Sequence, residues 1–301
     1  MDFSALGEHG ILFFPVTPYD GEGRIRIDLL AEHIESRMPW KPDAVFVACG
    51  TGEFLSYGLE EYREAVAAAV GVVAGRVPVF AGAGYTAALA SEFTERAAEA
   101  GADGILLFPA VGPYTQRGLV EHYSAVAARS ALPIILYQRD GVKLGDETVR
   151  RLLDVDTIVG LKDGVGDVER AGRTRVISQG RWAMFNGMPT AELSARAYAG
   201  IGVRPYSSAA FAFIPELATR FRTALDTGDE AVLDQLVAEF YGPLGELRDK
   251  GAGYLISLVK AALAIRGFDA GAPRSPIGRP EAAHEDALRA LIDRGLELAV
   301  G

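Results

Sequence analysis

Cysteine is nearly absent from this sequence, which has a single one, Cys49, among 301 residues. One cysteine cannot form an intramolecular disulfide, and this composition suits a reducing compartment. No apolar run approaches the roughly 18 residues that a membrane-spanning helix needs. The first ten residues contain Asp2 and Glu8 and lack the apolar core of a signal peptide. We therefore expect a cytoplasmic protein with no membrane partner.

Basic residues are in deficit: Lys and Arg number 30 against 40 Asp and Glu, and the formal net charge is −10. An acidic chain is a poor partner for nucleic acids and for anionic membranes. A small anionic substrate is compatible with this charge if a few local cations or backbone amides meet it.

Signals for a metal or a dissociable cofactor are also missing. The four histidines fall on separate helical or terminal segments, without the spacing of metal ligands: His9, His33, His122 and His284. Gly82-Ala83-Gly84 is half of a dinucleotide fingerprint, but Ala87 stands where the third glycine belongs. We expect neither a metal nor a cofactor.

What the sequence does contain is a regular alternation of short strand-type runs and helical patterns, which predicts a parallel sheet. The expected strands are Ile11–Val16, Ala44–Ala48, Val77–Ala81, Gly104–Phe108, Pro133–Tyr137, Thr157–Lys162, Trp182–Phe185 and a last one near Ile201–Tyr206. The expected helices are Asp28–Met38, Leu59–Val73, Thr86–Ala100, Gln116–Arg129, Asp146–Leu153, Val168–Ser178, one that starts near Pro189, and Ile214–Thr227. Eight strand–helix units predict a closed (β/α)₈ TIM barrel of the α/β class.

The rest of the chain reads as three further helices, Asp229–Lys250, Gly253–Arg266 and Ala282–Ala299. The last two are separated by residues 267–280, a connector rich in glycine and proline. We therefore divide the chain into a barrel, residues 1–227, and a C-terminal helical appendage, residues 228–301, that packs on it.

Lys162 closes the apolar strand Thr157–Lys162 and is followed by an acidic, glycine-rich turn. Burial disfavours the charged form of a lysine and lowers its pKa. A neutral amine can attack a ketone and form a Schiff base. The alternative is that Lys162 only pairs with Asp163 or Asp167 at the end of the strand.

Chemistry in a TIM barrel gathers where the strands end and the loops to the following helices begin. Tyr137 ends the strand next to that of Lys162, so its hydroxyl can transfer protons during imine formation; taken alone, it reads more simply as a core tyrosine. Gly50 and Thr51 follow the second strand and can offer amide N–H groups and a hydroxyl to a carboxylate. The neighbouring Cys49 has no histidine to activate it and is interpreted as a packing residue.

These strand ends resemble a known family. Pro15–Pro18 after strand 1, Gly-Thr-Gly-Glu after strand 2, the tyrosine ending strand 5, Gly-Leu-Lys-Asp ending strand 6 and three C-terminal helices are similar to the dihydrodipicolinate synthase/N-acetylneuraminate lyase superfamily of class I aldolases. The resemblance covers essentially the whole chain. It implies that Lys162 forms the Schiff base, that Tyr137 relays protons, and that the protein is a homo-oligomer, a tetramer or dimer.

Three further motifs resemble the decarboxylating branch, 5-dehydro-4-deoxyglucarate dehydratase. They are Lys162–Asp167, Phe185–Glu192 and the pair formed by Tyr206–Ala209 with Phe213–Pro215. The synthase's tyrosine pair after strand 4 is missing, since Ala110 and Val111 follow Pro109. One departure from the dehydratase pattern is Gln138, where that branch usually has asparagine.

This branch implies a six-carbon keto diacid as substrate, which loses water and carbon dioxide to give 2,5-dioxopentanoate. The resemblance places Gly50 and Thr51 at the carboxylate beside the ketone, and Asn186, Ser207 and Ser208 at the hydroxyls and the distal carboxylate. Two alternatives remain: a pyruvate-dependent aldolase, lyase or synthase of the same superfamily, and a barrel that binds a keto acid without turnover.

Overall fold

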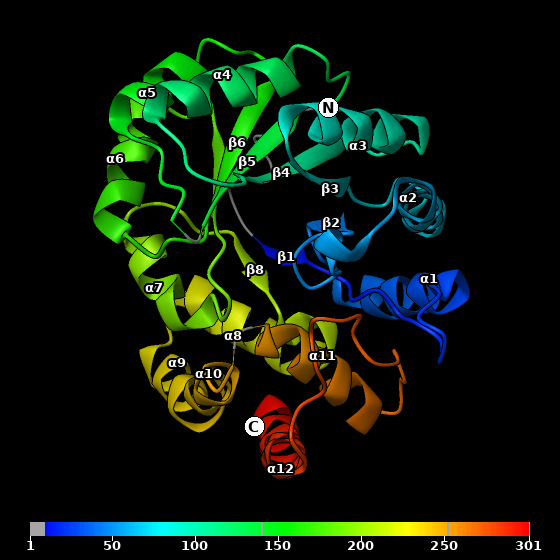
Figure 1. The fold of residues 1–301 in the computed structure, drawn as a ribbon. Helices are drawn as coiled ribbons and strands as arrows, with labels where there is room; N and C mark the ends of the chain where they lie inside the picture. Colours follow the sequence, from blue (N-terminus) through cyan, green and yellow to red (C-terminus); the bar gives the residue numbers. More distant parts are fainter. Residues whose placement is uncertain (1–9, 140, 252, 301) are drawn as a thin grey trace.

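The computed structural model describes residues 10–139, 141–251 and 253–300 and forms one closed barrel of eight parallel strands in sequence order, β1 to β8. Helices follow the strands and surround the barrel (Figure 1). This architecture confirms the expected (β/α)₈ fold with additional C-terminal helices. Residues 1–9, for which the sequence predicts no signal peptide, lie outside the described residues.

The eight strands are β1 Ile11–Phe13, β2 Ala44–Val47, β3 Val79–Tyr85, β4 Gly104–Ala110, β5 Ile134–Gln138, β6 Ile158–Asp163, β7 Ala183–Asn186 and β8 Tyr206–Ser208. The barrel helices are α1 Ile27–Arg37, α2 Leu59–Val73, α3 Ala87–Glu99, α4 Gln116–Ala127, α5 Asp146–Leu152, α6 Val168–Ser178, α7 Glu192–Gly200 and α8 Pro215–Thr227.

The last strand lies later in the chain than the sequence pattern suggested. The expected strand near Ile201–Tyr206 is wrong: Ile201 caps α7, and β8 begins only at Tyr206. Pro205 directly precedes β8 and lacks the N–H that a central strand donates, so pairing starts after it. Ser207 and Ser208 therefore belong to the strand itself.

Stacked aromatic rings fill the interior of the barrel. The ring of Phe46 lies 4.6 Å from that of Phe14 and 4.9 Å from that of Phe80, measured between centroids, and both pairs are nearly parallel. Phe185 packs against Phe46 from the β7 side. These rings form the upper layer of the packed core. Phe14 is the ring of this stack that also lines the cavity above it.

The C-terminal helices gather beside α8, at one side of the barrel (Figure 1). They are α9 Glu230–Leu236, a π-helical turn Val237–Tyr241, α10 Gly242–Arg248, α11 Tyr254–Ile265 and α12 Ala282–Val300. The first expected helix of this region thus runs as two α-helical pieces joined by the π-turn. No helix in the described residues is long and apolar enough to span a membrane.

Candidate active site

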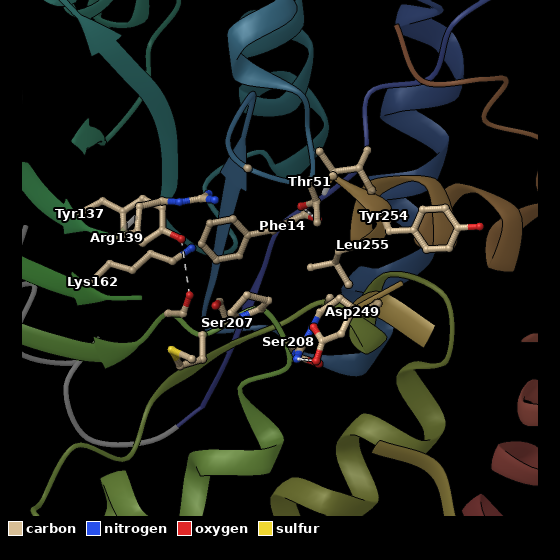
Figure 2. A pocket seen from close by; sticks show the side chains of 18 of the residues that line it. Phe14, Thr51, Tyr137, Arg139, Lys162, Ser207, Ser208, Asp249, Tyr254 and Leu255 are labelled. Atoms are coloured by element: carbon tan, nitrogen blue, oxygen red, sulfur yellow. Dashed lines mark hydrogen bonds and ion pairs between the residues drawn. The ribbon is translucent and has the colours of Figure 1, made fainter. Parts of the chain in front are cut away.

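A cavity of about 420 Å³ opens at the ends of the strands (Figure 2). This volume lies in the range of small-molecule sites. Barrel loops supply one part of its wall: Phe14, Gly50, Thr51, Tyr137, Arg139, Lys162, Gly187, Met188, Pro189, Ser207, Ser208 and Ala209. The end of α10, the start of α11 and residues between them supply the other part: Arg248, Asp249, Gly251, Gly253, Tyr254, Leu255 and Ile256.

The amine of Lys162 lies in a slot between two aromatic rings. Its Nζ is 3.8 Å from the ring centroid of Phe14 and 4.4 Å from that of Tyr137 (Figure 2). The residue is 4% exposed, and no carboxylate of the described residues forms a salt bridge with it. Burial lowers the pKa of Lys162 to about 7, and the charge of Arg139 acts in the same direction. A large share of the amine is therefore neutral near pH 7.

The two aspartates that were considered as partners of Lys162 are engaged elsewhere. Asp163 accepts hydrogen bonds from Gln138 Nε2 at 3.0 Å and from the Tyr198 hydroxyl at 2.6 Å. Asp167 caps the first turn of α6. The geometry therefore favours the reactive interpretation of Lys162 over a simple ion pair at the strand end.

Strand register explains why neighbouring residues face different environments. Tyr137, Lys162 and Phe185 are partners across β5, β6 and β7, and all three face the barrel interior. The next partners, Gln138, Asp163 and Asn186, point the other way, because successive side chains alternate across a strand. Gln138, the departure from the dehydratase pattern, thus lies behind the site, where its Oε1 accepts a hydrogen bond from the Leu144 amide.

Gly187 leaves room for the lysine chain. A Cβ at this position would lie 2.4 Å from Cγ and 2.6 Å from Cε of Lys162. Both distances are far below van der Waals contact, so any other residue here would displace the amine. The Gly187 carbonyl also accepts a long hydrogen bond, 3.5 Å, from the Tyr137 hydroxyl. This glycine therefore shapes the position of both groups expected to do chemistry.

The loop after β2 borders the same cavity. The Thr51 hydroxyl donates to the Phe14 carbonyl at 2.9 Å, which fixes the loop against β1. Among the described residues, no backbone carbonyl accepts a hydrogen bond from the amides of Gly50 or Thr51. Two N–H groups in one tight turn are a suitable site for a carboxylate.

Asn186 differs from the expectation that its side chain faces the substrate. It is fully buried and does not line the cavity. Its Nδ2 donates to the Ala191 carbonyl and to Ser194 Oγ, and its Oδ1 accepts from the Met188 amide at 3.1 Å. The structure therefore gives Asn186 a part in shaping the loop that carries Gly187.

The two serines of β8 face different sides. Ser207 is partner to Leu12 of β1 and is 8% exposed at the cavity. Ser208 borders the cavity but is fully buried, and its Oγ lies 2.5 Å from Oε1 of Glu192 on α7. Burial raises the pKa of Glu192 to about 7. Ser207 is thus placed to meet a ligand, whereas Ser208 connects the strand to a buried carboxyl.

Several lining residues were not predicted from the sequence as site residues. Arg139 extends over the Tyr137 ring, 5.6 Å from its centroid. Arg248 and Asp249 come from the end of α10, more than 80 positions after Lys162. Cys49, which precedes the cavity-lining Gly50, is buried, and burial raises the pKa of its thiol, in line with a packing role. Within the described part of the chain, no cluster of three or more His, Cys, Asp or Glu could hold a metal.

Solved structures with the same architecture come from dihydrodipicolinate synthases. The 4-hydroxy-tetrahydrodipicolinate synthase of Methylacidiphilum fumariolicum SolV is 27% identical, with a TM-score of 0.87 over 97% of each chain. The dihydrodipicolinate synthase of Bacillus clausii, at 24% identity, has a TM-score of 0.89 over 97% of this chain and 99% of its own. The latter likeness concerns the fold alone.

The relatives with the higher sequence identity are named dehydratases, unlike the solved structures, which are named synthases. A protein of Streptomyces avermitilis named probable 5-dehydro-4-deoxyglucarate dehydratase 1 is 46% identical, over 96% of this chain and 94% of its own length. A relative of Rhizobium rhizogenes named probable 5-dehydro-4-deoxyglucarate dehydratase is 40% identical, over 89% of each chain. The Dihydrodipicolinate synthetase family matches residues 8–294. With a lysine in an aromatic slot at the end of β6, and with these matches over most of its length, the chain belongs to the dihydrodipicolinate synthetase family.

Proposed function

We propose that this protein converts 5-dehydro-4-deoxyglucarate to 2,5-dioxopentanoate, water and carbon dioxide through a Schiff base on Lys162. The observation that carries the proposal is the buried Lys162 amine, which borders the cavity and has no carboxylate partner among the described residues. The names of the relatives in Streptomyces and Rhizobium support this substrate. The enzyme is thus a carbon–oxygen lyase.

One imine serves both steps of the reaction. Lys162 attacks the ketone, and loss of water gives an iminium that acidifies the adjacent CH₂ group. A proton leaves this carbon, and the resulting enamine expels the hydroxyl from the next carbon. The conjugated iminium then accepts the electron pair of the bond to the distal carboxylate, which leaves as carbon dioxide. The resulting dienamine is protonated on carbon, which restores the iminium. The enol tautomerises to the aldehyde, its carbon gaining a proton as its hydroxyl loses one, and hydrolysis of the iminium releases the product and the free Lys162 amine.

Each remaining residue has a limited task in this proposal. Tyr137, which borders the amine, transfers protons as the carbinolamine forms and collapses. The amides of Gly50 and Thr51 bind the carboxylate beside the ketone. The hydroxyl of Ser207 forms hydrogen bonds with the hydroxyls of the substrate. Asn186 and Ser208 act indirectly, through the loop before α7 and through Glu192.

The competing reactions use the same lysine and differ in products. A retro-aldolase would release pyruvate and no carbon dioxide. A keto-acid-binding barrel would form the imine without turnover. Ala110 ends β4 and Val111 follows it, so this segment lacks the tyrosine pair of the synthase branch. The dehydratase reaction therefore fits this cavity better than condensation with a second aldehyde.

The test is an assay of the purified protein without added metal or nucleotide. Aldehyde dehydrogenase coupling measures the semialdehyde, and bicarbonate detection measures one carbon dioxide per turnover. Borohydride reduction in the presence of substrate should modify Lys162 and none of Lys41, Lys143, Lys250 or Lys260, which peptide mass mapping distinguishes. Pyruvate as the product, or an adduct on a different lysine, would contradict the proposal.

We further propose that the enzyme acts in the cytoplasm as a homo-oligomer, a dimer or tetramer. The single, buried Cys49 suits a reducing compartment. The resemblance to the superfamily supports the oligomer. Light scattering coupled to size-exclusion chromatography measures the mass directly, and a 32.0 kDa species at assay concentration would exclude the oligomer.

A further inference from the structure

The two arginines of the cavity stand in different relations to Lys162. Arg139 lies close enough for its charge to lower the pKa of Lys162, whereas Arg248 does not contribute. In Figure 2, Asp249, the neighbour of Arg248, lies across the cavity from Lys162 and Tyr137, with Phe14 between them. The cavity thus has a cation on the far side from the amine.

Arg248 is held in place by the barrel. Its Nη1 donates to Thr190 Oγ1 at 2.8 Å, and Thr190 is a buried residue of the loop between β7 and α7. The side chain of Arg248 is 20% exposed. The C-terminal appendage therefore reaches the loop that also carries Gly187, and Thr190 fixes Nη1 of the guanidinium, leaving the edge formed by Nε and Nη2 for a different partner.

That other edge is occupied by a carboxylate of the protein. Nε and Nη2 of Arg248 donate to the two oxygens of Asp249 at 2.8 and 2.9 Å. This is the parallel two-bond geometry in which a guanidinium recognises a carboxylate. The Asp249 side chain is 68% exposed, and exposed ion pairs contribute little net stability. A second carboxylate can therefore replace Asp249 while Asp249 turns to water.

We propose that Arg248 binds the distal carboxylate of the keto diacid, and that Asp249 occupies this binding position when substrate is absent. This inference rests on the proposed function for the identity of the diacid. The ketone end lies at Lys162, with its carboxylate at the Gly50 and Thr51 amides. The chain of the substrate then extends across the cavity past Ser207, and the exchange of one carboxylate for another leaves the charge around Arg248 unchanged.

The experiment compares a diacid with a monoacid that have the same reacting end. The probes are 5-dehydro-4-deoxyglucarate and pyruvate, which has a ketone beside a carboxylate and no distal carboxylate. Borohydride trapping at increasing concentration gives an apparent Kd for the imine with each probe. The ratio of the two values, pyruvate over diacid, measures the preference for the distal carboxylate and does not require turnover.

Arg248→Met retains much of the side-chain length and removes the charge. It should lower this ratio by about 10- to 100-fold, as expected for the loss of a partly buried charged partner, with pyruvate trapping unchanged. Arg139→Met is the matched control. It should weaken both probes alike, because it raises the pKa of Lys162, and should leave the ratio unchanged. An unchanged ratio in Arg248→Met, or a drop in Arg139→Met instead, overturns the proposal.

Asp249→Asn removes the competing carboxylate. The ratio should rise by about 1.5- to 5-fold, the size expected for an exposed ion pair. A fall in the ratio would show that Asp249 holds Arg248 in its binding geometry, which contradicts the exchange. Circular dichroism and the Tm establish that each variant is folded. If the protein releases no carbon dioxide from the diacid, the proposed function fails, while the trapping ratios still test Arg248.

Discussion

Two buried lysines differ in whether a carboxylate lies next to the amine. Lys162 and Lys260 are 4% and 3% exposed, and each places its amine over a tyrosine ring, Tyr137 at 4.4 Å and Tyr19 at 4.2 Å. Lys260, however, forms a 2.7 Å ion pair with Glu53, whose side chain is also buried. Lys162 borders a cavity and has no ion-pair partner among the described residues.

The two sites differ in the charge that lies next to each amine. Burial lowers the pKa of both amines, but attraction to Glu53 opposes this effect at Lys260. The pairing with Glu53 therefore favours the charged form of Lys260, which cannot attack a carbonyl group. An aromatic slot without a carboxylate leaves Lys162 free to lose its proton. We therefore expect the nearest anionic partner, more than burial itself, to decide which of the two lysines reacts with a ketone.

The largest expected effect is the loss of turnover and of imine formation when Lys162, and not Lys260, is replaced. Lys162→Met should lower turnover by roughly 10⁴- to 10⁶-fold, the range for removal of a catalytic nucleophile, and should abolish borohydride trapping. Lys260→Met should still form the trapped imine. Peptide mapping after reduction measures both. An imine on Lys260 in either protein would contradict the distinction between the two lysines.

The next largest effect is a difference in turnover between variants of Tyr137 and Tyr19, the tyrosines whose rings lie next to the two lysines. Tyr137→Phe keeps the ring over Lys162 and removes the hydroxyl, so turnover should fall by ~10²- to 10⁴-fold if that hydroxyl transfers protons. Tyr19→Phe is the matched control, because its buried hydroxyl has no hydrogen-bond partner within the described residues. It should leave kcat unchanged. Near-normal turnover in Tyr137→Phe would return this residue to a packing role.

The free energy of unfolding should depend on Lys260 and not on Lys162, the opposite of the order expected for turnover. Lys260→Met leaves the Glu53 carboxylate buried without its partner, and we expect a loss of about 3–5 kcal/mol in the free energy of unfolding. Adding Glu53→Gln removes that charge and keeps an acceptor for the Arg274 amide, so it should restore most of the loss. Lys162→Met should not destabilise the protein. Urea unfolding at pH 7 gives all three values, and equal losses for both lysines would refute the comparison.

Glu192 extends the comparison to buried carboxyls. Unlike Glu53, it forms no ion pair and its Oε2 makes no hydrogen bond within the described residues, and its charge acts on the nearby hydroxyls of Tyr206 and Tyr241. Its pKa is raised from 4.5 to about 7, so the native state binds more protons than the unfolded chain between these values. The free energy of unfolding should therefore fall as the pH rises from 4.5 to 7, by on the order of 3 kcal/mol.

Glu192→Gln tests this pH dependence. The amide can still hydrogen-bond to Ser208 and does not ionise, so the variant should match the parent protein near pH 5 and exceed its stability at pH 8. Urea unfolding at the two pH values measures the difference. A variant with the same pH dependence as the parent protein would exclude Glu192 as its source.

The sequence was sufficient to predict the barrel and the position of Lys162 near the end of a buried strand, because both follow from local signals. Strand and helix patterns repeat eight times, and a charged residue closing a buried strand is visible without any knowledge of contacts. The orientation of Asn186 was less accessible. Side chains alternate along a strand, so a shift of one residue in register decides whether a side chain meets the substrate or the surrounding helices. Asn186 follows the inward-facing Phe185 and therefore points away.

The contribution of Arg248 could not be read from the sequence for a different reason. It lies in a helical segment outside the strand–helix repeat, and its place at the cavity depends on how the C-terminal helices pack against the loop that carries Thr190. The slot at Gly187 is also a tertiary feature, since it exists only where the glycine and Lys162 approach each other. Long-range packing of this kind leaves no periodic signal.

The aromatic slot also determines how the kinetic constants should depend on ionic strength. In the proposed mechanism the nitrogen of Lys162 stays between the rings of Phe14 and Tyr137 both as a neutral amine and as a cationic iminium, so no counter-ion has to enter or leave during the cycle. Dissolved ions screen exposed charges far more than buried ones. Added salt should therefore weaken substrate capture at the exposed edge of the cavity and raise KM, while kcat stays nearly constant.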